Sequence, residues 1–213
     1  MEEKRSLMRD RHFLWRFSKL FTISGDTGVG TSTTVELLYQ ILKEDRRMRF
    51  VSAGDIMRRE AKERGISIDD FVKMKEDGLS CDERIDAETE KYGTQNFGMI
   101  ESRIAHGLVP AAFHIKLKCP TNIRAERRRL TPAFSHLSLA EVEKYIIERD
   151  EADKARFDSL YTGYDWVDSD FDLVISTDNL NIPIQNARLI LDEHEKWLKK
   201  LSTKGIRIKR NIC

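Results

Sequence analysis

The chain has 213 residues, of which 40% are hydrophobic and 34% are charged, so it is long enough to bury one substantial core. Lys and Arg nearly balance Asp and Glu, and the formal net charge of +1 argues against the strong positive field of a nucleic-acid-binding or membrane-surface protein. We therefore expect small-molecule partners, with neither nucleic acid nor membrane among them.

Cysteine usage and hydropathy indicate the cellular compartment to expect for this chain. The cysteines, Cys81, Cys119 and Cys213, are an odd and scattered set without metal-ligand spacing, which favours a reducing, cytoplasmic setting. No apolar run approaches the ~20 residues that span a bilayer, and the N-terminus lacks the apolar core of a secretory signal. Residues 1–18 are interpreted as a basic, solvated lead-in, and residues 19–213 as one domain. A monomer is the favoured state.

Five short β-prone runs alternate with helical patterns along the chain. After the first run, Val35, Leu38 and Leu42 recur at helical spacing, and a last helical pattern begins near residue 183. Strands that alternate with helices predict a mostly parallel, doubly wound sheet. We therefore expect a three-layer α/β/α fold with five parallel strands, at residues 20–24, 49–53, 97–100, 113–117 and 171–175.

Two segments between these strands are longer than a simple crossover needs. The polar, helix-prone stretch at about residues 55–95 is predicted to be a substrate-binding insert. Farther along the chain, Ser138 and Glu141 have the spacing of a capping box that opens a helix through about Leu160. This helix belongs to a segment at about residues 124–160 that we expect to act as a lid.

A glycine-rich loop follows the first predicted strand and precedes a helix, which is the context of a phosphate-binding P-loop. Glycines let successive backbone N–H groups turn toward phosphate oxygens, and the helix N-terminus adds a positive dipole. Ser32 stands where a hydroxyl would ligate Mg²⁺, whereas Thr31 replaces the usual lysine. The alternative is a glycine-rich turn without a ligand. The predicted ATP-binding residues of this P-loop kinase fold are Gly25, Gly28, Val29, Gly30, Thr31, Ser32 and Thr33.

At this point the chain resembles the cytidylate kinase family, in particular its short archaeal-type branch, whose P-loops often carry threonine at the position of Thr31. The similarity runs from about residue 20 to residue 177 and includes segments 50–58, 101–103 and 149–156. The resemblance implies that ATP, with Mg²⁺, donates its γ-phosphoryl group to cytidine monophosphate (CMP) or its deoxy form.

The same resemblance assigns site residues. It implies that Arg58, in a segment that also contains Gly54, holds the acceptor phosphate together with Arg103. Ser102 replaces a glycine of the family, and its side chain would crowd the monophosphate pocket. On the lid helix, the resemblance implies that two arginines bridge the phosphate chains and that an aspartate helps to hold the acceptor ribose. These residues are Arg149, Arg156 and Asp153.

Charge neutralisation is the main task in phosphoryl transfer, so arginines and Mg²⁺ carry most of it. Arg149, Asp153 and Arg156 lie at i, i+4 and i+7, and therefore project from one helix face. Arg127 or Arg128 would reach the donor phosphates when the lid closes. The alternatives are a solvated helix end for Arg127 and Arg128, and a surface ion-pair ladder for the others.

Other functions remain open from the sequence alone. A phosphate acceptor needs no general base, but a hydroxyl acceptor would, and Asp55 or Glu101 would then supply it. Asp55 is otherwise expected to cap the helix that starts there, and Glu101 to hold a Mg²⁺-bound water or to pair with an arginine of the lid. The remaining alternatives are a kinase for AMP or UMP and a non-catalytic nucleotide-binding protein. Asp82 and Asp86 share a helix face in the insert, where one interpretation is that they help to frame the acceptor. The favoured interpretation is solvated surface, the usual state of paired carboxylates.

Overall fold

The computed structural model describes residues 19–42, 48–73, 75–76, 79–94, 97–161, 167–178 and 183–203. The predicted lead-in at residues 1–18 lies outside this set, as does Cys213. Within the described residues, the structure contains no helix long and apolar enough to cross a bilayer.

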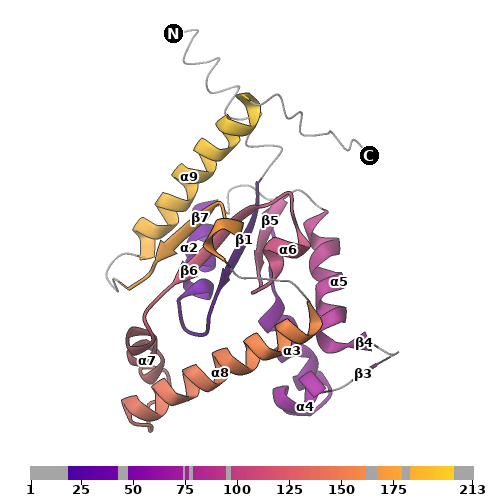
Figure 1. Cartoon of the computed structure of the whole chain (residues 1–213), viewed down its shortest axis with the longest axis vertical. Helices are drawn as coiled ribbons and strands as arrows, with labels where there is room; N and C mark the ends of the chain where they lie inside the picture. Colours follow the sequence, from indigo (N-terminus) through magenta and orange to yellow (C-terminus); the bar gives the residue numbers. More distant parts are fainter. Residues whose placement is uncertain are drawn as a thin grey trace.

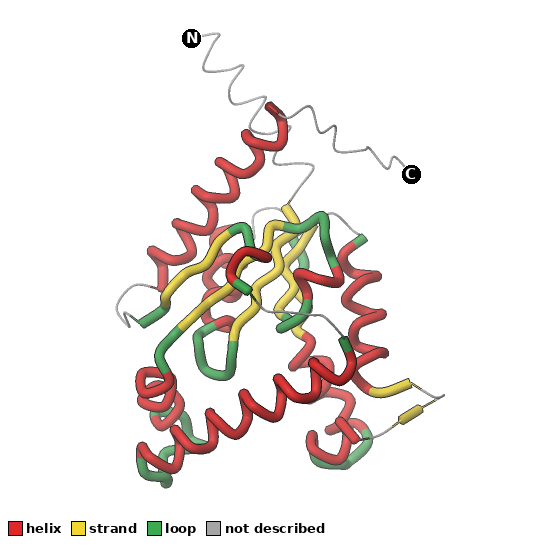
Figure 2. Tube along the Cα trace, in the orientation of Figure 1, coloured by secondary structure: helices red, strands yellow, loops and turns green. Residues whose placement is uncertain are grey.

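The central sheet has five parallel strands, as the sequence predicted, and their order is β2-β5-β1-β6-β7 (Figures 1 and 2). In the middle strand, Phe21 pairs with Met99 on one side and Phe113 on the other. The last strand begins two residues later than expected, because the Asp172 side chain accepts a hydrogen bond from the His114 amide at 2.9 Å just before the ladder starts. The strands are β1 (Lys19–Gly25), β2 (Phe50–Ser52), β5 (Phe97–Glu101), β6 (Phe113–Lys118) and β7 (Leu173–Ser176).

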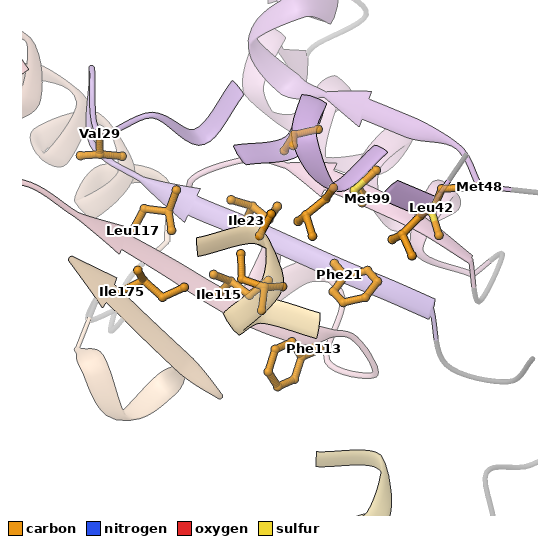
Figure 3. Close-up of a cluster of buried hydrophobic side chains, with 14 residues drawn as sticks. Phe21, Ile23, Val29, Leu42, Met48, Met99, Phe113, Ile115, Leu117 and Ile175 are labelled. Atoms are coloured by element: carbon orange, nitrogen blue, oxygen red, sulfur yellow. The ribbon is translucent and has the colours of Figure 1, made fainter. Parts of the chain in front are cut away.

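Helices α2 (Thr31–Leu42) and α9 (Pro183–Thr203) cover one face of the sheet. Side chains alternate across a strand, so Phe21 and Ile23 of β1 point to this face and are buried. They pack with Leu38 of α2 and Ile190 of α9, in the cluster of Figure 3. Each large apolar side chain buried in this way contributes about 1.5–3 kcal/mol to folding. This cluster fixes the position of β1 and therefore of the loop that follows it.

The opposite face is covered by α6 (Ala105–Leu108) and α5 (Cys81–Gly93). Leu20 and Ile100 pack there, but this face also contains polar groups. The Thr22 hydroxyl lies 2.8 Å from Nδ1 of His114. Burial, followed by the nearby His114, lowers the pKa of His106 to about 4, so this buried imidazole is neutral at physiological pH.

A helical unit lies between β2 and β5, where the sequence predicted the insert. It consists of α3 (Ala53–Glu63), α4 (Ile68–Lys73), a short antiparallel pair, β3 (Lys75–Glu76) with β4 (Leu79–Ser80), and α5. Phe71 is fully buried among Ile56 and Ile85 in a small core of this unit. The expectation that Asp55 caps α3 is wrong, because the helix starts earlier and the Ser52 side chain accepts the Asp55 N–H at 3.2 Å.

Between β6 and β7 the chain forms α7 (Thr121–Arg129), α8 (Leu139–Leu160) and a 3₁₀ turn, η1 (Asp168–Asp170). The predicted capping box is confirmed: the Ser138 hydroxyl accepts the Glu141 N–H at 3.3 Å, and the Glu141 carboxylate accepts the Ser138 N–H at 2.8 Å. In Figure 1, α8 crosses the carboxyl end of the sheet from α7 toward α3. Its inner face is thereby brought opposite the glycine loop.

Candidate active site

A cavity of about 630 Å³ opens at the carboxyl ends of the parallel strands. This edge is where open α/β sheets bind their ligands, because loops and helix N-termini converge there. Its walls come from the glycine loop after β1, from α3 and α5, from the segment after β5, and from α8. The cavity therefore lies between the helical unit that follows β2 and the long helix that precedes β7.

The glycine loop lies against this cavity with a tightly constrained backbone. Gly28 has φ +83°, a left-handed conformation that glycine adopts without strain. A side chain at Gly25 would place its Cβ 2.5 Å from Val29 and 2.9 Å from the Leu117 carbonyl oxygen, so only glycine fits there. The Val29 side chain is buried in the core, and its carbonyl accepts the Thr177 hydroxyl at 2.6 Å. Of the predicted loop residues, Gly25, Gly28, Thr31 and Ser32 line the cavity, whereas Val29, Gly30 and Thr33 do not.

Two oxygen groups meet at the start of α2. The Ser32 hydroxyl donates a hydrogen bond to Oε1 of Glu101 at the end of β5, at 2.9 Å. Hydroxyl and carboxylate oxygens are the ligand type that Mg²⁺ prefers, and this ion usually takes only one or two protein ligands together with phosphate oxygens and water. The pair therefore fits the predicted metal position at Ser32.

The glycine loop is tied to α7 and α8 through Thr27. The Arg124 guanidinium is buried and donates to the Thr27 carbonyl at 3.1 Å and to Asp150 at 2.6 Å. The same carboxylate accepts the Thr27 N–H at 3.3 Å. Sequence reasoning gave Arg124 no role of its own, because four arginines lie close together at positions 124, 127, 128 and 129 and nothing local indicates which of them turns inward.

Asp153 is the centre of the charged network on α8. Its carboxylate is buried and accepts from Arg149 Nε at 3.0 Å, while Arg156 Nη2 lies 3.1 Å away. It also forms an ion pair with Arg103, whose other guanidinium nitrogen donates to the Thr27 hydroxyl at 2.7 Å. Arg149, Asp153 and Arg156 therefore lie on one face of α8, as predicted. The structure adds Arg103 to this charged network.

Asp82 and Asp86 lie on the cavity wall, which corrects their interpretation as solvated surface. Asp82 is only 8% exposed and lies 3.6 Å from Arg156. The buried Oδ2 atom of Asp86 has no hydrogen-bond partner among the residues that the structure describes. Burial, followed by the charge of Asp82, raises the pKa of Asp86 to about 7.

Arg58 lies at the α3 side of the cavity. Its guanidinium is exposed and paired with Asp55 at 2.5 Å, and it lies over Gly54. A Cβ atom at Gly54 would lie 3.3 Å from this guanidinium, so glycine gives the arginine room to lie against the backbone. Asp55 itself does not line the cavity. Ser102 does, and its carbonyl accepts the Ser24 hydroxyl at 2.7 Å.

The two adjacent arginines of α7 point in different directions. Arg127 donates to the carbonyl oxygen of Thr177 at the end of β7, and it does not line the cavity. Arg128 does line the cavity, and its guanidinium carbon lies 4.5 Å from the centre of the Phe134 ring. Consecutive residues on a helix are separated by about 100°, which accounts for the difference. The structure thus separates a pair of residues that the sequence treated alike.

The chemistry of the assembled cavity is dominated by guanidinium groups. Among the described residues, five arginines and no lysine line it, at positions 58, 103, 128, 149 and 156. Guanidinium groups bind phosphate oxygens bidentately and stay charged at all physiological pH values. The arrangement can therefore neutralise two phosphate-bearing ligands that meet above the glycine loop.

Comparison with known proteins gives relatives along most of the chain. It is 32% identical over 168 residues to a protein named cytidylate kinase from Methanosphaera stadtmanae, a match that covers 76% of this chain and 91% of that one. Proteins of the same name from Sulfurisphaera tokodaii and Sulfolobus acidocaldarius are 31% and 36% identical, over 88% and 79% of this chain and 99% and 90% of theirs. No family model matches the chain.

Solved structures share the fold at low sequence identity. An uncharacterized protein from Eubacterium ventriosum has a TM-score of 0.62 at 12% identity and covers 83% of this chain and 98% of its own. A shikimate kinase from Bacteroides thetaiotaomicron has a TM-score of 0.54 at 11% identity, over 86% of this chain and 98% of its own. These likenesses support the three-layer α/β/α P-loop kinase fold and carry no information on the acceptor.

Proposed function

This chain belongs to the cytidylate kinase family, and on that premise we propose that it transfers the γ-phosphoryl group of ATP to CMP or dCMP, producing ADP and CDP or dCDP. The observation that carries the proposal is that one cavity receives the glycine loop, the Ser32–Glu101 pair and arginines from several separate parts of the chain. A donor and an acceptor phosphate can then meet in one cavity.

The donor side is formed by the glycine loop and the start of α2. Gly25, Gly28 and Thr31 line the cavity there and would turn backbone N–H groups toward the phosphates of ATP, with the dipole of α2 behind them. Ser32 and Glu101 would hold Mg²⁺ directly or through water. When bound, this ion neutralises charge on the phosphate oxygens and orients them for in-line transfer.

The acceptor side is formed by the unit between β2 and β5. Arg58 and Arg103 would hold the acceptor phosphate, with Gly54 leaving room for the Arg58 guanidinium. The phosphate oxygen of a nucleoside monophosphate is already anionic at neutral pH, so transfer needs no general base. Asp55, one of the two candidate bases for a hydroxyl acceptor, is 62% exposed and paired with Arg58, which makes it a poor base.

The arginines of α8 would neutralise the group in transfer. Arg149 and Arg156 are held by Asp153 at the cavity wall, so their charges are already ordered before any substrate arrives. This arrangement compensates for Thr31, which leaves the loop without its usual lysine. Preorganised charge stabilises a phosphoryl-transfer transition state more than charge that must be ordered during the reaction.

The direct test is ADP formation from ATP and Mg²⁺ with CMP, dCMP, UMP or AMP, or with no acceptor. We expect turnover with CMP or dCMP well above that with the other acceptors. Raised thermal stability in the presence of ATP, without turnover of any acceptor, would instead indicate a nucleotide-binding protein that does not catalyse transfer.

A further inference from the structure

We propose that the carboxyl group of Asp86 selects the acceptor base by accepting a hydrogen bond from an exocyclic amino group, so that an amino-bearing pyrimidine is preferred over a keto-bearing one. This inference rests on the proposed function, because it assigns one residue of the same cavity to the base of the acceptor nucleotide. Cytosine has the amino group at the relevant ring position, and uracil has a carbonyl oxygen there.

The place of Asp86 on α5 is the first argument. Asp82 lies one turn earlier, where it contacts Arg156, and four residues of helix advance about 6 Å along the axis. Asp86 therefore lies one turn of α5 beyond the residue that contacts the Arg156 guanidinium. Three side chains with apolar surface, Ile85, Met57 and Phe157, line the same cavity and suit the faces of a ring.

The unsatisfied Oδ2 atom is the second argument. It is buried, it has no hydrogen-bond partner among the described residues, and it belongs to a residue of the cavity wall. Buried polar atoms are almost always paired, and leaving one without a partner is unfavourable. When the carboxyl group is ionised, a ligand that brings a donor to this atom recovers that cost, whereas a ligand that brings an acceptor does not.

The protonation state of Asp86 makes the selection depend on pH. The charged groups that act on it are Asp82, Glu83 and Glu90 on α5 and Arg156 on α8, and the net effect of these groups and of burial is a pKa of about 7. The charged groups between α5 and α3 include an ion pair, in which Arg84 of α5 lies 3.8 Å from Glu60 of α3.

The ionised carboxylate of Asp86 only accepts hydrogen bonds, whereas the protonated form can also donate one. Only the protonated form can therefore pair with the carbonyl oxygen of uracil.

The test compares kcat/KM for CMP and UMP between pH 6 and pH 8 in the wild type and in Asp86→Asn. The two nucleotides carry the same phosphate, so the ratio of the two values cancels the titration of that phosphate. We expect the wild-type preference for CMP to rise by at least about tenfold over this range, following the ionised fraction of a group with a pKa near 7.

The asparagine side chain of this variant would offer both a donor and an acceptor at every pH. Asp86→Asn should therefore lower the preference for CMP by roughly 10-fold or more at pH 8 and remove its pH dependence. Glu88→Gln is the matched control, because Glu88 is exposed on the same helix and does not line the cavity. Asp86→Ala, which removes the hydrogen-bonding group altogether, repeats the comparison if the asparagine variant is poorly folded.

The outcomes separate this inference from the proposed function. A wild type that turns over CMP, together with an Asp86→Asn variant that keeps the same preference and the same pH dependence, overturns the role of Asp86 alone. A wild type that phosphorylates none of CMP, dCMP, UMP and AMP overturns the proposed function and this inference with it. Equilibrium binding of CMP and UMP to the wild type and to Asp86→Asn, measured without ATP, should show the same change in preference.

Discussion

Asp153 on α8 forms an ion pair with Arg103, which follows β5, so the long helix is joined directly to the end of the central sheet. The same carboxylate holds Arg149 and Arg156, and all four residues line one cavity. The charges that would act on phosphate are therefore placed by a buried anion of the protein itself.

Replacement of Arg156 by alanine should lower kcat/KM for CMP by roughly 100-fold or more, because a guanidinium that contacts the transferring group stabilises mainly the transition state. Steady-state ADP formation measures this effect. Arg129→Ala is the control, since Arg129 is exposed on α7 and does not line the cavity. Equal rates for the Arg156 variant and the wild type would remove Arg156 from the mechanism.

Replacement of Asp153 by asparagine should lower the free energy of unfolding by about 3 kcal/mol, because three guanidinium groups then lose the buried anion that they share. Chemical denaturation measures this loss. ATP should raise the melting temperature of the variant more than that of the wild type, since phosphate oxygens can supply the missing negative charge. An unchanged free energy of unfolding would contradict this account of the network.

Alanine variants of the two neighbouring arginines on α7 should have different phenotypes. Arg127→Ala should mainly lower stability, by about 1–2 kcal/mol, because Arg127 holds the carbonyl of Thr177 at the end of β7. Arg128→Ala should mainly raise the KM for ATP, because Arg128 lines the cavity and is held against an aromatic ring. Denaturation and steady-state kinetics on both proteins test the distinction. Identical profiles would contradict it.

Asp86 should also make stability depend on pH. The pKa of Asp86 is about 7 in the folded chain, against an ordinary value of 3.8. Between pH 3.8 and 7, the folded state therefore keeps a proton on Asp86 that the unfolded state has lost. The resulting stabilisation is complete below pH 3.8 and is lost as the pH rises through 7. The loss should be about 2–4 kcal/mol, because solvent screens part of the interaction.

His106 acts in the opposite sense, because its pKa of about 4 lies below its ordinary value of 6.5. Its contribution is present above pH 6.5 and is lost as the pH falls through 4, so the two effects overlap in the acidic range. The free energy of unfolding should therefore be compared between about pH 6.5 and 8, where roughly 1 kcal/mol or less of the Asp86 contribution is still to be lost and Asp86→Asn should flatten that decline. A decline that persists in the variant would assign it to another group.

Local patterns were enough to predict the elements that frame the site. The five strands and the capping box at Ser138 depend on residues close together in the sequence, and the structure confirms them. The sequence also predicted the P-loop between β1 and α2, because its spacing and its neighbours agree.

The unpredicted features depend on tertiary packing. Asp82 and Asp86 have the composition of a solvated helix face, and only the packing of α5 beside α8 turns that face toward the cavity. The arginine cluster on α7 gave no sign that Arg124 turns inward, whereas Arg127 turns to β7. Local propensity determines where a helix starts, but the direction of each side chain depends on what the helix packs against.

The hydrogen bond from the Thr27 amide to Asp150 has a consequence for measurement. An amide in a surface loop normally exchanges its proton with solvent quickly, but this one is paired with a carboxylate that belongs to α8. The exchange rate of a single proton at Thr27 therefore reports whether α8 is docked on the glycine loop, without an attached probe group or a substrate. An anion that accepts a hydrogen bond from this amide must first displace the Asp150 carboxylate. The exchange rate of the Thr27 amide proton therefore responds both to anion binding at the loop and to the position of α8.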